Sequence, residues 1–126
     1  LGVMERHGRV FPLFHVLADV GEFAEAEVLR SEANQPLTVD GFALRRDGKT
    51  RILLANFSAS RQEVEVAGLE GEARLHRLDE QSVVLATHDP EAFRAQTGAP
   101  IKAVHEGFRL ELAPFAVARI DMVTTL

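Results

Sequence analysis

The chain has 126 residues, 46% of them hydrophobic and 26% charged, which is enough apolar material for one globular domain with a core of its own. A net charge of -5, with Lys49 and Lys102 as its lysines, excludes the basic surface that binds nucleic acid, and no apolar stretch reaches the roughly 20 residues that cross a membrane. The absence of cysteine excludes disulfides, thiol catalysis and thiolate metal sites, and it fits the reducing cytoplasm, where we expect the protein to act.

The first predicted element is a helix from Pro12 to about Glu22, where apolar residues recur at near-helical spacing and Pro12 suits a first helical turn. Gly21 weakens a helix by about 1 kcal/mol relative to Ala, so we expect the helix to end near it. His15 and Asp19 lie four residues apart and are interpreted as a polar pair on a solvated face. The apolar residues spread over more than one side, which predicts contact with a second domain or a second copy through these residues: Leu13, Phe14, Leu17 and Val20.

Beyond this helix the sequence is typical of short strands separated by turns. Residues 26–33 favour a strand that ends in a turn at residues 34–36. Asp47 and Gly48 separate two further strands, and this dipeptide tolerates the positive φ angles of a two-residue hairpin. The strand after the hairpin is apolar on both faces from Ile52 to Phe57, so we expect it to lie centrally, with Phe57 in the core.

The second half of the chain continues with strands, interrupted once. Residues 62–67, 72–78 and 82–86 are predicted strands, and the first of them alternates Val with Glu, which indicates one wet face. A short helix is predicted near Glu91 to Gln96, with Asp89 as its cap, Pro90 at its first position and Gly98 after its end.

Two strands close the chain, at residues 107–113 and 115–123, and alternation assigns Phe108 and Phe115 to the core. Pro114 between them cannot donate a hydrogen bond to a ladder, so it belongs at a bend or an edge. About eight short strands without helical crossovers predict an antiparallel β-sandwich with an N-terminal helix. We expect an N-terminal helical segment at residues 1–25 and a β-sandwich domain at residues 26–126.

Three short motifs, "LLANFS", "LDE" and "LAPFAVARID", occur in this order after the predicted helix. With them the chain resembles, over nearly its whole length, the C-terminal β-sandwich that follows the last helix of (β/α)₈-barrel carbohydrate-active enzymes, both bacterial glycoside hydrolases and related sugar-acid lactonases. The resemblance implies a non-catalytic accessory domain that packs on a preceding barrel and stabilises it. It also implies that the catalytic carboxylates of the parent hydrolase lie at barrel strand ends outside this chain, and the start at Leu1 rather than Met fits a segment of a longer polypeptide.

Candidate catalytic and metal-binding residues are few. Asp79 and Glu80 are adjacent in a predicted turn, so their carboxylates point apart and are poorly placed for acid and base catalysis. Asp89 and nearby histidines have the ligand types of a divalent-ion site but no fixed spacing; the histidines are His76, His88 and His105. We therefore predict no catalytic residue, no metal site and no cofactor in this chain.

Two alternatives to a barrel-packing domain stay open. The first is a saccharide-binding module, because such sandwiches hold sugars on exposed aromatic rings, with Trp and Tyr preferred. The chain has neither, and Phe93, in the predicted excursion at residues 89–96, is the candidate that remains. The competing interpretation is that Phe93 pins this excursion onto the sandwich. The second alternative is a free-standing interaction domain that dimerises through the N-terminal helix.

Overall fold

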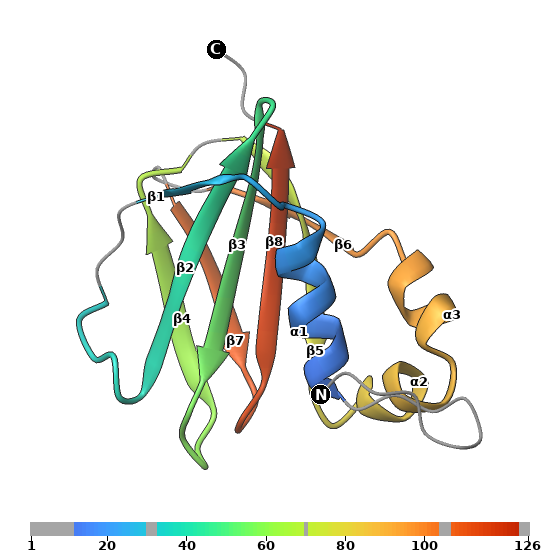
Figure 1. Cartoon of the computed structure of the whole chain (residues 1–126). Helices are drawn as coiled ribbons and strands as arrows, with labels where there is room; N and C mark the ends of the chain where they lie inside the picture. Colours follow the sequence, from blue (N-terminus) through green and yellow to red (C-terminus); the bar gives the residue numbers. More distant parts are fainter. Residues whose placement is uncertain (1–11, 30–32, 70, 104–106, 124–126) are drawn as a thin grey trace.

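The computed structural model describes residues 12–29, 33–69, 71–103 and 107–123 (Figure 1). Within these ranges the chain forms eight strands and three helices, and every strand pair is antiparallel, which confirms the predicted β-sandwich with an N-terminal helix. In chain order the elements are α1 (Pro12–Gly21), β1 (Glu27–Leu29), β2 (Val39–Arg46), β3 (Lys49–Asn56), β4 (Gln62–Ala67), β5 (Glu72–Leu78), α2 (Val83–His88), α3 (Pro90–Ala95), β6 (Ala99–Lys102), β7 (Gly107–Leu112) and β8 (Val117–Val123).

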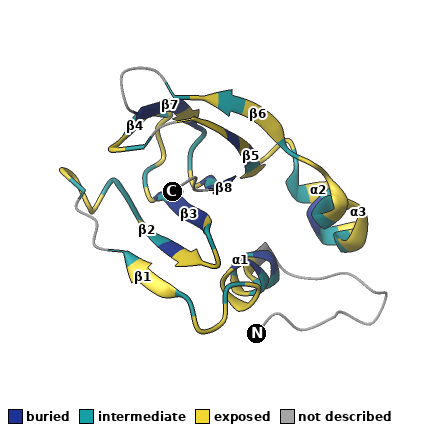
Figure 2. Ribbon diagram, turned by 90° about the horizontal axis from the view of Figure 1, so that it is seen from above, coloured by how far each residue is buried: buried dark blue, intermediate teal, exposed yellow. Residues whose placement is uncertain are grey.

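The strands form one large sheet and one small sheet. The large sheet has the order β1-β2-β3-β8-β5-β6, and β4 pairs with β7 in the small sheet. β3 therefore lies between β2 and β8, in the central position that its two apolar faces predict. Figure 2 shows the small sheet over one face of β3 and β8, with α1 on the opposite face and with α2 and α3 beside β5. The face of the large sheet that carries α1 is called the outer face below.

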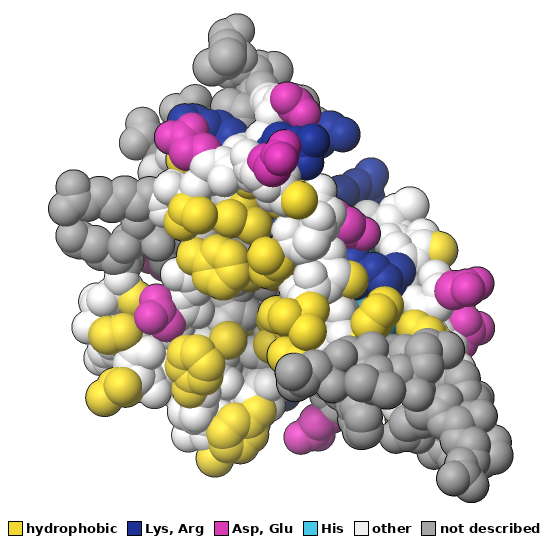
Figure 3. All heavy atoms as spheres, viewed as in Figure 1, with side chains coloured by type: hydrophobic (Ala, Val, Ile, Leu, Met, Phe, Trp, Pro, Cys, Tyr) yellow, Lys and Arg dark blue, Asp and Glu magenta, His cyan; other side chains and the backbone are white. Residues whose placement is uncertain are grey.

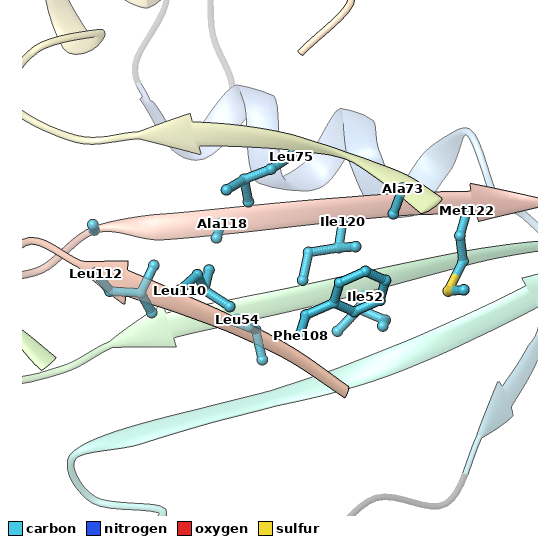
Figure 4. Close-up of a cluster of buried hydrophobic side chains, with 11 residues drawn as sticks. Ile52, Leu54, Ala73, Leu75, Phe108, Leu110, Leu112, Ala118, Ile120 and Met122 are labelled. Carbon is cyan, nitrogen blue, oxygen red and sulfur yellow. The ribbon is translucent and has the colours of Figure 1, made fainter. Parts of the chain in front are cut away.

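The hydrophobic core fills the space between the two sheets (Figure 4). Alternation along β7 and β8 places their apolar residues on this side, as the sequence predicts, and Phe108 is buried with 1% of its surface exposed. The core residues come mainly from β3, β5, β7 and β8, and they are Ile52, Leu54, Ala73, Leu75, Phe108, Leu110, Leu112, Ala116, Ala118, Ile120 and Met122.

The hairpin between β2 and β3 has the predicted two-residue turn. Arg46 pairs with Lys49, and the two residues between them have positive φ angles, 53° at Asp47 and 77° at Gly48. Asp and Gly are among the residues that adopt this conformation at low cost, so the dipeptide fixes the register of both strands.

The strand predicted at residues 82–86 is wrong, because residues 83–88 form the helix α2. The Asp79 carboxylate accepts hydrogen bonds from the backbone N–H groups of Gln81 and Ser82 at 2.9 and 3.3 Å, which makes a tight turn where a strand would have to begin. α2 then buries Ala86 completely. This burial outweighs the β preference of two adjacent valines. The edge strand β6 was not predicted, because Pro100 weakens its strand signal.

The other described elements lie where they were predicted, apart from two phenylalanines; of the strand predicted at residues 26–33 the structure shows β1 at Glu27–Leu29, and residues 30–32 lie outside the described ranges. α3 begins as expected, since the Asp89 side chain accepts a hydrogen bond from Ala92 N–H at 3.1 Å. The core positions predicted for Phe57 and Phe115 are wrong, because 56% and 66% of their surfaces are exposed. Phe57 follows the end of β3, and Phe115 lies in the turn before β8 with a φ of 57°, which breaks the alternation of the strand.

Candidate interdomain site

α1 is held on the outer face of the large sheet by ionic groups that are mostly buried or half-buried, with Glu22, the residue after α1, exposed. They come from α1, β3, α3 and β8, which lie far apart in the sequence. These groups, called the charge cluster below, are three arginines and three carboxylates: Arg51, Arg94, Arg119, Asp19, Glu22 and Asp121. Equal numbers of opposite charges allow the cluster to be buried without a net charge.

Asp19 is the centre of the charge cluster. Its Oδ1 atom accepts hydrogen bonds from Arg94 Nη2 and from Arg119 Nη1, both at 2.7 Å. Its backbone carbonyl accepts a further hydrogen bond from Arg51 Nη1 at 2.9 Å. The solvated polar pair predicted for this helix is therefore wrong: only 2% of His15 and 7% of Asp19 is exposed, because the sheet and α3 supply partners that the sequence order does not reveal.

Arg51 joins β3 to β8 and to the end of α1. It donates to both carboxylate oxygens of Asp121, from Nε at 2.7 Å and from Nη2 at 3.2 Å, and this two-point geometry is the strongest that a guanidinium makes. Its Nη1 atom donates to Glu22 Oε1 at 2.6 Å, and its guanidinium lies 4.6 Å from the centre of the Phe23 ring. Arg119 Nε is 3.0 Å from Asp121 Oδ2, but this contact is not aligned as a hydrogen bond.

The pKa values show how strongly these groups interact. Burial alone raises the pKa of Glu22, but hydrogen bonds and charge from Arg51 and Arg94 outweigh burial and leave this pKa below its ordinary value. Burial and the nearby charge of Arg119 lower the pKa of His76, which lies in β5. Glu22 is therefore charged and His76 is neutral at pH 7.

His15 and Arg94 connect α1 to α2 and α3. His15 Nε2 lies 2.7 Å from the carbonyl oxygen of Ala86, so the hydrogen is assigned to Nε2 and donated to that oxygen. Arg94 Nη1 donates to the backbone carbonyl of His15 at 3.2 Å. The ring of Phe93 meets the ring of His15 edge to face, with the ring centres 4.5 Å apart, and is partly buried by this contact. Such packing is what a residue that pins the excursion onto α1 would show.

The side of α1 that faces away from the sheet is apolar. Leu13, Leu17 and Val20 are exposed, with half of Leu17 accessible to solvent, and they are called the helix face below. Phe14 is partly buried, with its ring 5.3 Å from that of His15. Hydrophobic side chains gather over α1 in Figure 3, and more of them lie over β2 and the end of β3. α1 thus turns its polar side toward the sheet and its apolar side outward, the reverse of an ordinary surface helix.

A pocket of about 800 Å³ opens beside the C-terminal end of α1, between Phe23 and Pro100. Its charged lining is balanced, because four cationic side chains face four carboxylates, so it favours neither an anion nor a cation. These residues are Arg46, Lys49, Arg51, Arg74, Glu22, Asp47, Glu72 and Asp121.

The other sequence-predicted candidates have structural contacts or lie apart. The Asp79 carboxylate is used by the turn before α2, and Asp89 caps α3. In the part of the chain that the structure describes, no group of three His, Asp or Glu side chains could hold a metal ion, and His105 lies outside that part. None of the described helices is long and apolar enough to cross a membrane.

The charge cluster itself was missed by the sequence analysis. Arg119 and Asp121 alternate with Ala118 and Ile120, a pattern that usually indicates a strand with one wet face. The available signal was that β8 lies at the centre of the large sheet, where other elements pack on both faces, so its polar side chains are also covered. That signal became usable only with the sheet order in hand.

The two sheets and their order define an immunoglobulin-like β-sandwich placed after a helix. Residues 36–120 match the family described as "D-apionate lactonase, C-terminal immunoglobulin-like domain". The match covers more than half of the chain, and the chain therefore belongs to this family. No curated protein sequence matches the chain.

Solved structures share the fold at low sequence identity. A glycoside hydrolase family 30 subfamily 8 xylanase, Xyn30A, from Clostridium acetobutylicum has a TM-score of 0.67 at 10% identity, over 95% of this chain and 30% of that chain. A GH30 endoxylanase from Clostridium papyrosolvens C71 has a TM-score of 0.64 at 14% identity, over 87% and 27%. A Paenibacillus polymyxa xyloglucanase from family 44 has a TM-score of 0.58 at 13% identity, over 78% and 19%. The chain thus spans less than a third of each of these proteins.

Proposed function

We propose that this chain is a non-catalytic accessory domain that packs on the barrel of a sugar-lactone hydrolase and stabilises that barrel. The family supports a position after another domain, because its description names a C-terminal domain of a lactonase. The similar solved structures support a larger partner, because each is more than three times the length of the matched region. In this proposal the barrel carries the chemistry and this chain carries none.

The observation that carries the proposal is the orientation of α1. The charge cluster fixes the polar side of α1 to the sandwich, so the helix face is left without a partner among the described residues. A helix that served only the sandwich would bury its leucines against the sheet, since each fully buried leucine contributes about 1.5–3 kcal/mol. Leu13 and Leu17 are instead held in position for a second body, and an exposed apolar patch of this kind typically marks an interface.

The proposal gives residues 1–25 and 26–126 different tasks. The segment at 1–25 is the connection to the barrel, with α1 as the last barrel helix or its continuation. The sandwich at 26–126 is the support. Because Arg51 and Arg119 of the sheet bind Asp19 of α1 directly, the two segments would move as one body, and the barrel would have a fixed orientation on the sandwich.

Activity measurements test this function. We would assay the full-length polypeptide and residues 1–126 alone against sugar-acid lactones and against glycosides under the same conditions. We expect lactone turnover by the full-length polypeptide and none by residues 1–126. Turnover by residues 1–126 alone would show that the sandwich holds a catalytic site, and glycoside but no lactone turnover by the full-length polypeptide would reassign the parent to the glycoside hydrolases.

A further inference from the structure

A second apolar surface lies on the outer face of the large sheet, beside α1. Phe42 in β2 alternates with Ala43, which packs on the core, so Phe42 points to the opposite side. Its register partner is Leu53 in β3, which alternates in the same way with Ile52 and Leu54. Val28 pairs with Leu44 of the same side, and Phe57, whose N–H donates to Thr38 O just beyond β3, continues the alternation of Leu53. Val28, Phe42 and Phe57 are exposed, and they form what is called the outer apolar face below.

The geometry points to the outer apolar face as the second half of a barrel interface, continuous with the helix face, in which the barrel of the same polypeptide covers Phe42 and Phe57. This inference rests on the proposed function and specifies the surface that performs it. Leu53 and Leu44 are already buried on this side of the sheet, with 4% and 5% of their surfaces exposed, so α1 and the outer face share one apolar layer. On β2 this layer is bounded by Asp40 and Arg46, which lie on the same side of the strand as Phe42 and Leu44.

The chemistry of the outer apolar face favours a protein over a saccharide. Aromatic rings stack on sugars, but sugar sites also need polar groups that bind the hydroxyls. The phenylalanines have no polar atom, and the neighbouring exposed residue on β1 is Val28. The carboxylate of Asp40, on the same side of β2, accepts a hydrogen bond from the Gly41 N–H at 2.8 Å. In Figure 3 the hydrophobic side chains run down this face, while most charged side chains lie toward its margins.

The barrel is favoured over a second copy because of where α1 lies in the chain. α1 precedes the sandwich in sequence, and the family places the sandwich at the C-terminal end of a lactonase. We therefore expect a domain that precedes α1 to lie on the side of the sheet that carries α1. The outer apolar face is on that side and the small sheet is on the other (Figure 2).

Thiol labelling of variants of the full-length polypeptide that each carry one introduced cysteine tests this inference. The 126 residues contain no cysteine, so each introduced thiol is identified by mass spectrometry of its own peptide. The variants are Phe42→Cys and Phe57→Cys on the outer apolar face, Leu17→Cys on the helix face, and Val84→Cys as a control. Val84 is exposed, with 65% of its surface accessible against 56% for Phe57, and it belongs to α2, which is part of neither surface. Maleimide labelling rates are measured in native buffer and in denaturant, with Val28→Cys as a second outer-face variant if Phe42→Cys fails to fold.

We expect native labelling of Phe42→Cys and Phe57→Cys to be at least about tenfold slower than that of Val84→Cys after normalisation to the denatured rates, because the centre of an interface is as well packed as a protein interior. Protection that is unchanged on dilution supports the barrel as the occupant. Protection that disappears on dilution assigns the outer apolar face to a second copy. Protection that needs added xylo- or malto-oligosaccharide assigns it to a saccharide. Either result overturns the inference.

The Leu17→Cys variant separates this inference from the proposed function. Fast labelling at Phe42→Cys with slow labelling at Leu17→Cys overturns this inference alone, whereas fast labelling at both positions overturns the proposed function as well.

Discussion

Asp19 Oδ1 lies 2.7 Å from Arg119 Nη1, although the two residues stand 100 positions apart in the sequence. This contact joins the only described helix before the sandwich to its central strand pair, and Arg94 donates to the same oxygen from α3. Three elements therefore depend on one carboxylate. Removing one partner of a buried ion pair leaves the other charge buried without compensation. The loss of stability is then larger than the net stabilisation that the intact pair provides.

Replacing Asp19 with Ala is expected to lower the free energy of unfolding by about 3 kcal/mol, because Arg94 and Arg119 stay partly buried and lose their shared acceptor. The matched control is Glu63→Ala, whose partner Arg109 is exposed on the small sheet. An exposed ion pair contributes at most about 1 kcal/mol, so the control should change little. The measurement is the urea midpoint of both variants, and equal midpoints would mean that the charge cluster does not hold α1.

Replacing Leu54 with Ala is expected to destabilise the protein by about 2–5 kcal/mol, since Leu54 is buried in the core and truncation leaves a cavity. Arg109→Ala should cost within about 0.5 kcal/mol, because Arg109 alternates with Phe108 and Leu110 onto the exposed face of β7. Chemical denaturation of the two variants compares them. A larger loss for Arg109→Ala would show that β7 faces the other way.

The lowered pKa of His76 predicts a loss of stability in mild acid. The folded protein binds a proton at His76 less tightly than the unfolded chain does, so the unfolded chain takes up more protons once the pH falls below 6.5, the ordinary pKa of histidine. The contribution is therefore present above pH 6.5 and is lost as the pH falls through the lowered pKa. His76→Leu should flatten this part of the pH profile of the melting temperature. Glu22→Gln should lower stability at pH values above 4.5, the ordinary glutamate pKa, because the folded-state pKa of Glu22 is lowered, and this loss should disappear as the pH falls through the lowered pKa.

Residues 1–126 produced without a barrel are expected to self-associate through the helix face, since Leu13 and Leu17 are exposed and lack the proposed partner. Light scattering over a concentration series measures this association, and Leu17→Glu should weaken it while the far-ultraviolet circular dichroism stays that of a β protein. Leu37→Glu serves as the control, because Leu37 is more exposed and lies in the turn before β2. A domain that stays monomeric at high concentration would indicate that the helix face of α1 needs no partner other than the sandwich.

The sequence predicted those parts of the fold whose signals are local. The Asp47-Gly48 turn, the alternation in β7 and β8, and the Asp89 cap each depend on a few adjacent residues, and each is confirmed. α2 was missed because its start depends on side-chain hydrogen bonds of Asp79 and its stability on the burial of Ala86, neither of which appears in the periodicity of two valines.

The sequence predicted the exposed part of the candidate site but not its ionic contacts. The apolar residues spread over more than one side of α1, which predicted that Leu13 and Leu17 would not be buried by the sandwich, and both are exposed. The partners of Asp19 could not be predicted, because Arg94 and Arg119 reach it only through the folded sheet and α3. For the same reason Phe57 was assigned to the core: an apolar residue on the outer face of a sheet has the same pattern as one in the core, and only the fold shows which side it faces.

Thermal unfolding of the full-length polypeptide shows whether the helix face of α1 supports a barrel. The comparison is Leu17→Glu against Val84→Glu, which places the same new charge at an exposed apolar residue of α2. We expect Leu17→Glu to lower the melting temperature of the barrel by about 2–4 °C for each kcal/mol of lost contact, while Val84→Glu leaves it unchanged. Equal melting temperatures for the two variants and the unmodified polypeptide would mean that the helix face does not support a barrel.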